Sequence, residues 1–391
     1  MRRDAVAFAA AFLLSRGQPF LEALLLSALL SVSDFGIWSW AVGLWAGTVA
    51  FTHFGVPAAT FRYAALPEVD PSVLFWQALR ETRYSLLVGS LSLLGLALTV
   101  PAPVQKTTLF FLPALLSQLL SEVMRSYFRG RYENFPLALW QGTYSLLGLL
   151  LVGGGAWWGG LSGATWGKAV QGLVPILLAP VFLPVPPYRR SPALPGFWRF
   201  AREAYLGNLA LEVIFFLPTW LLGWRSRDPV LLAYWRWATL LPLNLRQIAA
   251  QVVLYLYPRW VPSSLPLYRL YQLYRFRLWL GIGAFYVVAS LWVFMWDWFP
   301  GPAYREARLP YLLALLVSLF WSVEANLLPN LLSARGYIHH YRGAYLAGAL
   351  LASVMYLVAG SNLYLYLVGL GMAGLVSAVY AYGKIHSSKG L

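Results

Sequence analysis

The sequence contains no cysteine, and only 11% of its 391 residues are charged. The missing cysteines exclude a disulfide-stabilised scaffold. A soluble domain carries about 25% charged residues, so this chain has less than half of the charge that a water-facing surface needs. The composition therefore excludes an ordinary soluble enzyme and a disordered protein.

Acidic residues are the scarcer charge, with 14 against 29 Lys and Arg, which gives a formal net charge of +15. A basic excess of this size suits either nucleic acid or a membrane surface. Hydrophobic residues make up 60% of the chain, and that share favours a membrane protein. We expect no nucleic-acid partner, and the positions of the charges become the informative feature.

Long apolar stretches recur along the whole chain. About 20 apolar residues cross the hydrocarbon core of a bilayer as a helix, and stretches of that length do not fit the shorter alternating strands of a barrel. The sequence therefore predicts an all-α polytopic membrane protein with about 12 transmembrane helices. The predicted spans are 8–31, 37–61, 84–104, 107–124, 136–156, 160–183, 203–223, 230–257, 278–296, 309–334, 343–360 and 363–383.

The basic residues are distributed unevenly between the two sides that these spans define. Of the 29, 20 fall on the side of both termini, five on the opposite side and four inside spans. Cytoplasmic loops of membrane proteins carry the excess of Lys and Arg. We therefore expect a multi-pass protein of the cytoplasmic (inner) membrane with both termini in the cytoplasm, and the Tyr- and Arg-rich stretch 268–277 as an interfacial anchor.

A short internal repeat suggests that the chain has two halves. Residues 17–22 read Gly-Gln-Pro-Phe-Leu-Glu, and residues 207–212 read Gly-Asn-Leu-Ala-Leu-Glu, 190 positions later. A proline-rich segment lies between the halves. We predict an N-terminal lobe at 1–184 with spans one to six, a cytoplasmic linker at 185–198, and a C-terminal lobe at 199–391 with spans seven to twelve. Internal repeats are common in secondary transporters.

Seven charged residues lie away from the ends of the predicted spans. A charge at the centre of a span costs about 2.5–3.5 kcal/mol on insertion scales, whereas an interhelical polar contact contributes only about 0.6–2 kcal/mol. A polar substrate cavity is therefore favoured over charges that only hold helices together, although this alternative stays open. With the amides that accompany them, the candidate cavity residues are Arg16, Gln18, Glu22, Lys168, Asn208, Glu212, Arg236, Asn244, Arg246, Gln247, Glu324 and Asn326.

Two further patterns concern single helices. In the fourth span, four polar residues recur on one helical face, namely Gln118, Glu122, Arg125 and Arg129. We assign the two arginines to topology. The glycines at 153–155 and 159–160 are interpreted as formers of a short external turn.

Several features of enzymes are missing from the sequence. It has no Walker A motif, no His cluster with metal-ligand spacing and no large external loop with paired carboxylates. We expect no enzymatic activity, no catalytic residue, no metal and no cofactor. A coupling ion, either a proton or Na⁺, is left open.

The order of several short motifs resembles the polysaccharide (lipid-linked oligosaccharide) flippases of the multidrug/oligosaccharidyl-lipid/polysaccharide exporter superfamily. Ser33-Asp34-Phe35-Gly36-Ile37-Trp38 is similar to the entry of that family's second span, and the stretch 53–63 is similar to its end. The stretch 128–134 resembles the short turn before the fifth span, and Pro258 stands where the family usually has a proline. Many members are longer, with up to fourteen spans.

The resemblance implies two six-helix lobes around a central cavity that is cationic and receives a polyprenyl-diphosphate-linked oligosaccharide by alternating access. By position, it assigns Arg16, Glu22, Glu212 and the basic residues of span eight to that cavity. The implied partners are the lipid-linked glycan, membrane lipids, and glycosyltransferases or a polymerase of the same pathway. A cation-coupled multidrug exporter of the same superfamily and a non-transporting envelope-assembly scaffold are the alternatives.

Overall fold

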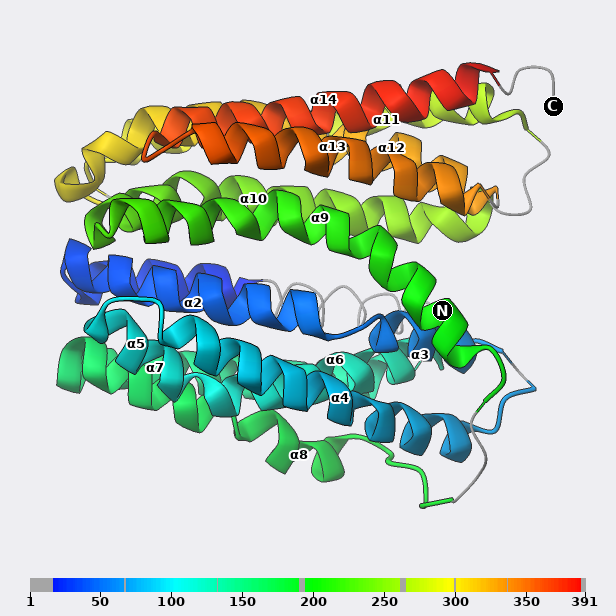
Figure 1. Ribbon diagram of the computed structural model, residues 1–391, viewed down its shortest axis with the longest axis horizontal. Coiled ribbons are helices and arrows are strands. Elements are labelled where there is room, and N and C mark those ends of the chain that lie inside the picture. The colour runs from blue at the N-terminus through cyan, green and yellow to red at the C-terminus, as the bar shows by residue number, and fades with distance from the viewer. Residues whose placement is uncertain are drawn as a thin grey trace. The chain divides into compact units, whose positions relative to one another are not determined.

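The computed structural model describes residues 17–66, 68–131, 133–189, 194–260, 265–298, 300–335 and 337–387. Helices are the only regular elements in these ranges, as the sequence predicts. The chain separates into two compact units, with the division between Leu206 and Gly207. Within each unit, long helices run side by side (Figure 1).

The described residues of unit 1 form eight helices and the start of a ninth. They are Gly17–Leu29, α2 (Val32–Thr52), α3 (Val56–Ala64), α4 (Pro71–Ala97), α5 (Ala102–Phe110), α6 (Leu112–Gly130), α7 (Asn134–Gln171), α8 (Val174–Phe182) and the first part of α9 (Phe197–Ser226). Unit 2 contains the rest of α9, α10 (Pro229–Trp260), α11 (Leu267–Leu291), the 3₁₀ helices η1 (Trp292–Met295) and η2 (Pro302–Ala307), α12 (Arg308–Ala334), α13 (Ile338–Val358) and α14 (Leu363–Ser387).

A described helix lies over each of the twelve predicted spans. By length and apolar composition alone, seven of the described helices could cross a membrane, or eight if the bent pair of α5 and α6 counts as one. One of the seven, the stretch Phe135–Phe182, covers two predicted spans. Helix α4 falls outside this set because Arg80, Glu81 and Arg83 lie within it. The prediction of an all-α polytopic membrane protein is confirmed.

The second predicted span is broken where α2 ends and α3 begins. Phe54 (φ 47°) and Gly55 (φ 72°) occupy the left-handed region there, which glycine adopts without steric cost. The Cα of Gly55 also packs against the backbone carbonyl of Ala201 in α9, where a Cβ would clash. The Tyr205 hydroxyl donates to the Phe51 carbonyl oxygen at 2.7 Å, so the start of α9 is fixed to this break.

Helix α7 is a tight hairpin of two helical segments. The turn lies at Gly159 and Gly160, and Gly160 has φ 56°. Before and after the turn, Gly155 and Gly163 face one another so closely that a Cβ on either would overlap the other's backbone. Small residues allow such close helix packing in membranes. The interpretation as turn formers holds for residues 159–160 and is wrong for 153–155, which are helical.

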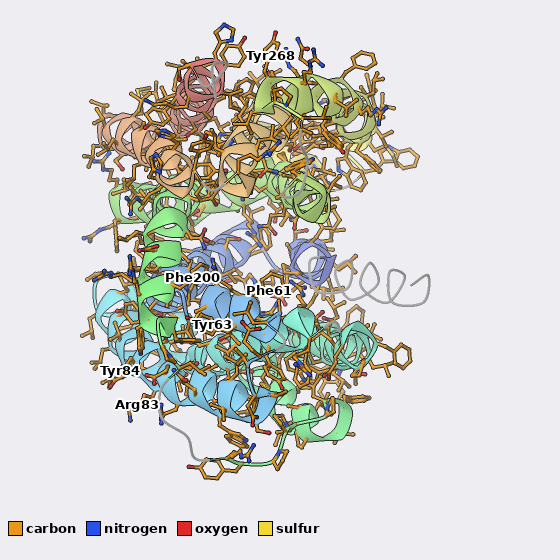
Figure 2. All side chains as sticks on the ribbon, turned by 90° about the vertical axis from the view of Figure 1, so that its right-hand side faces the viewer. Phe61, Tyr63, Arg83, Tyr84, Phe200 and Tyr268 are labelled. Carbon is orange, nitrogen blue, oxygen red and sulfur yellow. The ribbon has the colours of Figure 1, made fainter. Side chains whose placement is uncertain are left out.

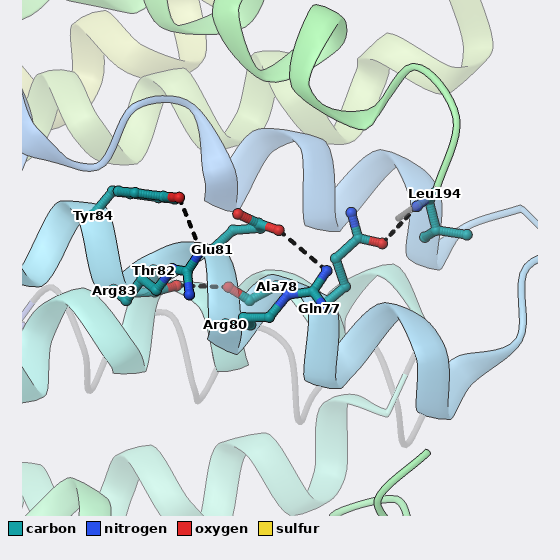
Figure 3. A network of polar contacts seen from close by, with 8 residues as sticks. All are labelled: Gln77, Ala78, Arg80, Glu81, Thr82, Arg83, Tyr84 and Leu194. Carbon is teal, nitrogen blue, oxygen red and sulfur yellow. Dashed lines mark hydrogen bonds and ion pairs between the residues drawn. The ribbon is translucent and has the colours of Figure 1, made fainter. Parts of the chain in front are cut away.

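The described parts of the predicted linker lie along α3 and α4. The Trp76 indole donates to the Pro186 carbonyl oxygen at 3.1 Å, and the Tyr63 hydroxyl donates to the Pro195 carbonyl oxygen at 2.7 Å. The Leu194 amide donates to Oε1 of Gln77 at 2.8 Å, as Figure 3 shows. These contacts attach the described linker residues to unit 1, up to the division inside α9.

Each unit has its own aromatic core. In unit 1, Phe75, Phe128 and Trp140 are fully buried among α3, α4, α6 and α7. In unit 2, the Trp321 indole of α12 donates to the Leu370 carbonyl oxygen of α14 at 2.8 Å, and its ring packs on Gly374. Large aromatic side chains against glycine bring α12 and α14 close together, which fixes the position of the polar residues of α12.

Candidate functional site

The first candidate cluster is a buried ion pair in unit 1. Nζ of Lys168, in the second segment of α7, lies 3.1 Å and 3.0 Å from the two carboxylate oxygens of Glu22. Only 8% and 6% of these side chains are exposed. Nζ also lies 5.2 Å from the ring centroid of Trp45. Each charge needs the other here, because an unpaired buried charge is strongly destabilising.

Gln18 is buried one turn before Glu22 on the same helix. Arg16, which the sequence assigns to the same region, lies outside the described residues. Three of the candidate residues are therefore described in unit 1: Gln18, Glu22 and Lys168. The sequence placed Lys168 among the candidate cavity residues, and in the structure its ammonium group binds Glu22.

The polar stripe predicted on the fourth span is a connected cluster. Gln118 Nε2 and Arg125 Nη2 both donate to Oε1 of Glu122, each at 2.8 Å. Arg125 is buried. Its guanidinium therefore neutralises a carboxylate within α6, a contact that the assignment to topology alone did not include.

The second candidate cluster is a buried carboxylate in unit 2. Glu324 of α12 is 6% exposed and accepts three hydrogen bonds from α11. The donors are the Tyr271 hydroxyl at 2.8 Å, Arg275 Nε at 2.6 Å and the Trp279 indole at 2.8 Å. These donors recur every four residues along α11, so they lie on one helical face. They attach α11 to α12.

The sequence did not identify these three donors as partners of Glu324. It placed Tyr271 and Arg275 in an interfacial anchor and gave Trp279 no role. Arg275 does remain half-exposed, with 52% of its side chain accessible. The four-residue spacing of the three donors was the available signal, because a polar stripe on an apolar helix indicates a polar partner on a neighbouring helix.

The other candidate of α12, Asn326, is hydrogen-bonded within its own helix. Nδ2 of Asn330 donates to Oδ1 of Asn326 at 3.0 Å, one turn away. Nearby, the hydroxyls of Tyr286 and Ser322 are 2.7 Å apart. Helix α12 thus contributes a series of polar side chains to the interior of unit 2.

Six candidates lie on α9 and α10 of unit 2. The Arg246 guanidinium stacks on the Phe215 ring, with 3.7 Å between its central carbon and the ring centroid. Such stacking is typical of the planar guanidinium of arginine. Asn244 Nδ2 donates to the Leu240 carbonyl oxygen at 2.6 Å. All six are half-buried: Asn208, Glu212, Arg236, Asn244, Arg246 and Gln247.

The fold matches solved structures of transporters from the MOP superfamily. The chain is 12% identical to an inward-facing multidrug resistance MATE family transporter, with TM-score 0.71 and 99% of both chains covered. It is 12% identical to the lipid II flippase MurJ in an inward closed conformation, with TM-score 0.73 and coverage of 97% of this chain and 87% of that one. A eukaryotic MATE transporter, AtDTX14, is 14% identical with TM-score 0.67 and coverage of 99% and 96%.

No protein-family model and no curated protein sequence matches the chain. At 12–14% identity, the structural likeness shows the fold. The solved structures that share it are transporters and not enzymes. The fold that the motif resemblance implies is therefore confirmed, while function has to be argued from the site.

Proposed function

We propose that this chain is a flippase that moves a polyprenyl-diphosphate-linked oligosaccharide across the cytoplasmic membrane by alternating access, for cell-surface polysaccharide biosynthesis. Both termini are then cytoplasmic. Glycosyltransferases or a polymerase of the same pathway would supply or use the glycan. MurJ, which shares the fold, is a lipid II flippase. That a protein with this fold moves a lipid-linked molecule supports the proposal of a lipid-linked substrate here.

The observation that carries the proposal is the pairing of the intramembrane carboxylates. Glu22 binds Lys168, and Glu324 binds Arg275. Two of the three carboxylates that the sequence places within the spans are thus held by basic side chains. A cationic drug would need carboxylates to bind it, so this pairing favours an anionic substrate.

The residues of the proposed site have different tasks. Arg246 and Arg236 bind the diphosphate, since a guanidinium fork matches phosphate oxygens. Glu212 limits how tightly the anion is held. The amides of unit 2 contact the sugars by hydrogen bonds, namely Asn208, Asn244, Gln247 and Asn326. The assignments of Arg16 and Gln18 to the substrate stay predictions from the sequence.

A reconstitution assay with variants of Arg246 tests this assignment. Proteoliposomes containing the wild-type chain should accelerate flipping of a fluorescent polyprenyl-diphosphate sugar. Arg246→Gln should reduce the rate by about tenfold or more, as expected for the loss of one charge-assisted hydrogen bond of about 1.5–3 kcal/mol. Arg246→Lys should recover part of it, since it keeps the charge and loses the fork.

The exposed Arg277 of α11 provides the matched control, since Arg277→Gln removes the same charge outside the proposed site. Equal rates for Arg246→Gln and Arg277→Gln, at equal protein content, would remove Arg246 from the mechanism. Extrusion of organic cations without flipping of any lipid-linked sugar would instead support the multidrug exporter. Absence of both activities would favour the scaffold.

A further inference from the structure

The starts of the third and seventh predicted spans lie together in unit 1. The spans begin at residues 84 and 203, far apart in the sequence. In the structure, Tyr84 of α4 and Trp198 of α9 meet edge to face, with ring centroids 6.3 Å apart. Tyr84 and Trp198 are 45% and 40% exposed. Two predicted membrane boundaries therefore coincide at one aromatic surface, where Tyr and Trp are favoured.

An arginine stands immediately before each of these two spans. Arg83 is exposed, and its guanidinium lies 4.7 Å from the Tyr84 ring centroid. Its Nη2 donates to the Tyr84 hydroxyl at 2.8 Å, which uses one of five N–H groups. Arg202 is exposed one helical turn after Trp198, on the same face of α9. Figure 2 shows Arg83 and Tyr84 at the edge of unit 1.

The acidic neighbours of this surface are already paired with other arginines. Glu81 is buried and lies 3.3 Å from Arg80, a contact that Figure 3 shows. Glu203 lies 3.6 Å from Arg199. Over the described part of the chain, no carboxylate pairs with Arg83 or Arg202. The surface therefore has an excess of two positive charges.

Exposed apolar side chains continue from this surface along α4. Leu87 and Leu91, at 60% and 61% exposure, follow Tyr84 at intervals of about one turn. The middle of α4 is therefore basic and aromatic at Arg83 and Tyr84, and the exposed side that follows is apolar. A molecule that fits must carry a negative charge at one end and a hydrocarbon chain at the other.

We propose that Arg83, Tyr84, Trp198 and Arg202 form a binding site for an anionic phospholipid of the cytoplasmic leaflet. The two guanidinium groups bind the headgroup phosphate. The aromatic pair supports the glycerol region at the level of the interface, and an acyl chain lies along Leu87 and Leu91. This site is independent of the transported substrate, so it stands even if the flippase proposal fails.

Lipid retention by the full-length protein tests the site. The protein is incorporated into nanodiscs of equal phosphatidylglycerol and phosphatidylcholine, and native mass spectrometry counts the lipids that stay bound. The double variant Arg83→Gln/Arg202→Gln should retain phosphatidylglycerol about 30-fold less strongly, given the attraction of each basic residue to an anionic leaflet. Unchanged thermal unfolding temperatures would show that the exposed substitutions leave the fold intact.

The double variant Lys106→Gln/Arg227→Gln is the matched control, because it removes two exposed basic residues that lie outside both the proposed site and the interfacial anchor. It should change retention by less than about threefold, since no charge of the proposed site is removed. An equal loss of phosphatidylglycerol retention in both double variants would show that general surface charge binds the lipid, and would overturn the proposal. Displacement of phosphatidylglycerol by a lower concentration of a polyprenyl diphosphate would also overturn it, by assigning the surface to the carrier lipid.

Discussion

At the scale of single residues, the main finding is that two carboxylates within the spans, Glu22 and Glu324, are paired with basic side chains. Lys168 and Glu22 are separated by 146 positions and share a bidentate contact. Sequence periodicity identifies neighbours only within one or two turns of the same helix, so it could not predict this contact between two helices. It did predict the stripe of Gln118, Glu122 and Arg125, whose contacts lie within one helix.

The buried pair predicts a characteristic pattern of stability. Lys168→Met leaves the Glu22 carboxylate buried and unpaired, and should lower the free energy of unfolding by about 3–5 kcal/mol. The double variant Glu22→Gln/Lys168→Met removes both charges and should recover most of that loss. Thermal unfolding in detergent would compare the three proteins. A double variant no more stable than Lys168→Met would contradict a direct coupling between these charges.

At the scale of helices, length and apolarity predicted where the helices are but not where they break. Helix α4 begins at Pro71, well before the predicted start at residue 84, because Asp70 caps it by accepting from the Ser72 and Val73 amides. Helices α5 and α6 meet at a bend of 44° next to Pro113, where proline interrupts helical hydrogen bonding. Hydropathy does not contain these local signals.

The hairpin of α7 allows a test with adjacent glycines. Gly155→Ala places a methyl group against the backbone of Gly163 and should destabilise the protein by about 1–3 kcal/mol. Gly154→Ala meets no atom within 4 Å and should be neutral or stabilise by up to about 1 kcal/mol, since alanine favours helix. Thermal unfolding measures both. Similar behaviour of the two variants would argue against close packing in this hairpin.

At the scale of the whole molecule, the sequence predicted the fold class and the structure confirmed it, because the bilayer restricts the possible architectures so strongly. The division inside α9, between Leu206 and Gly207, was not evident from composition. The proline-rich segment at 185–198 suggested a boundary at its own position, yet side chains such as Trp76 and Gln77 attach its described residues to unit 1. Composition shows where a chain cannot be helical, and contacts decide to which unit it belongs.

The central functional proposal also concerns the whole molecule: the chain transports an anionic lipid-linked sugar. The most direct test is the flipping rate in one set of proteoliposomes for two lipid-linked sugars that differ only in their linkage, one with a diphosphate and one neutral. If arginines select the substrate, the diphosphate form should flip at least about tenfold faster, the value of one charge-assisted contact. Equal rates for the two lipids, or faster flipping of the neutral one, would contradict the account.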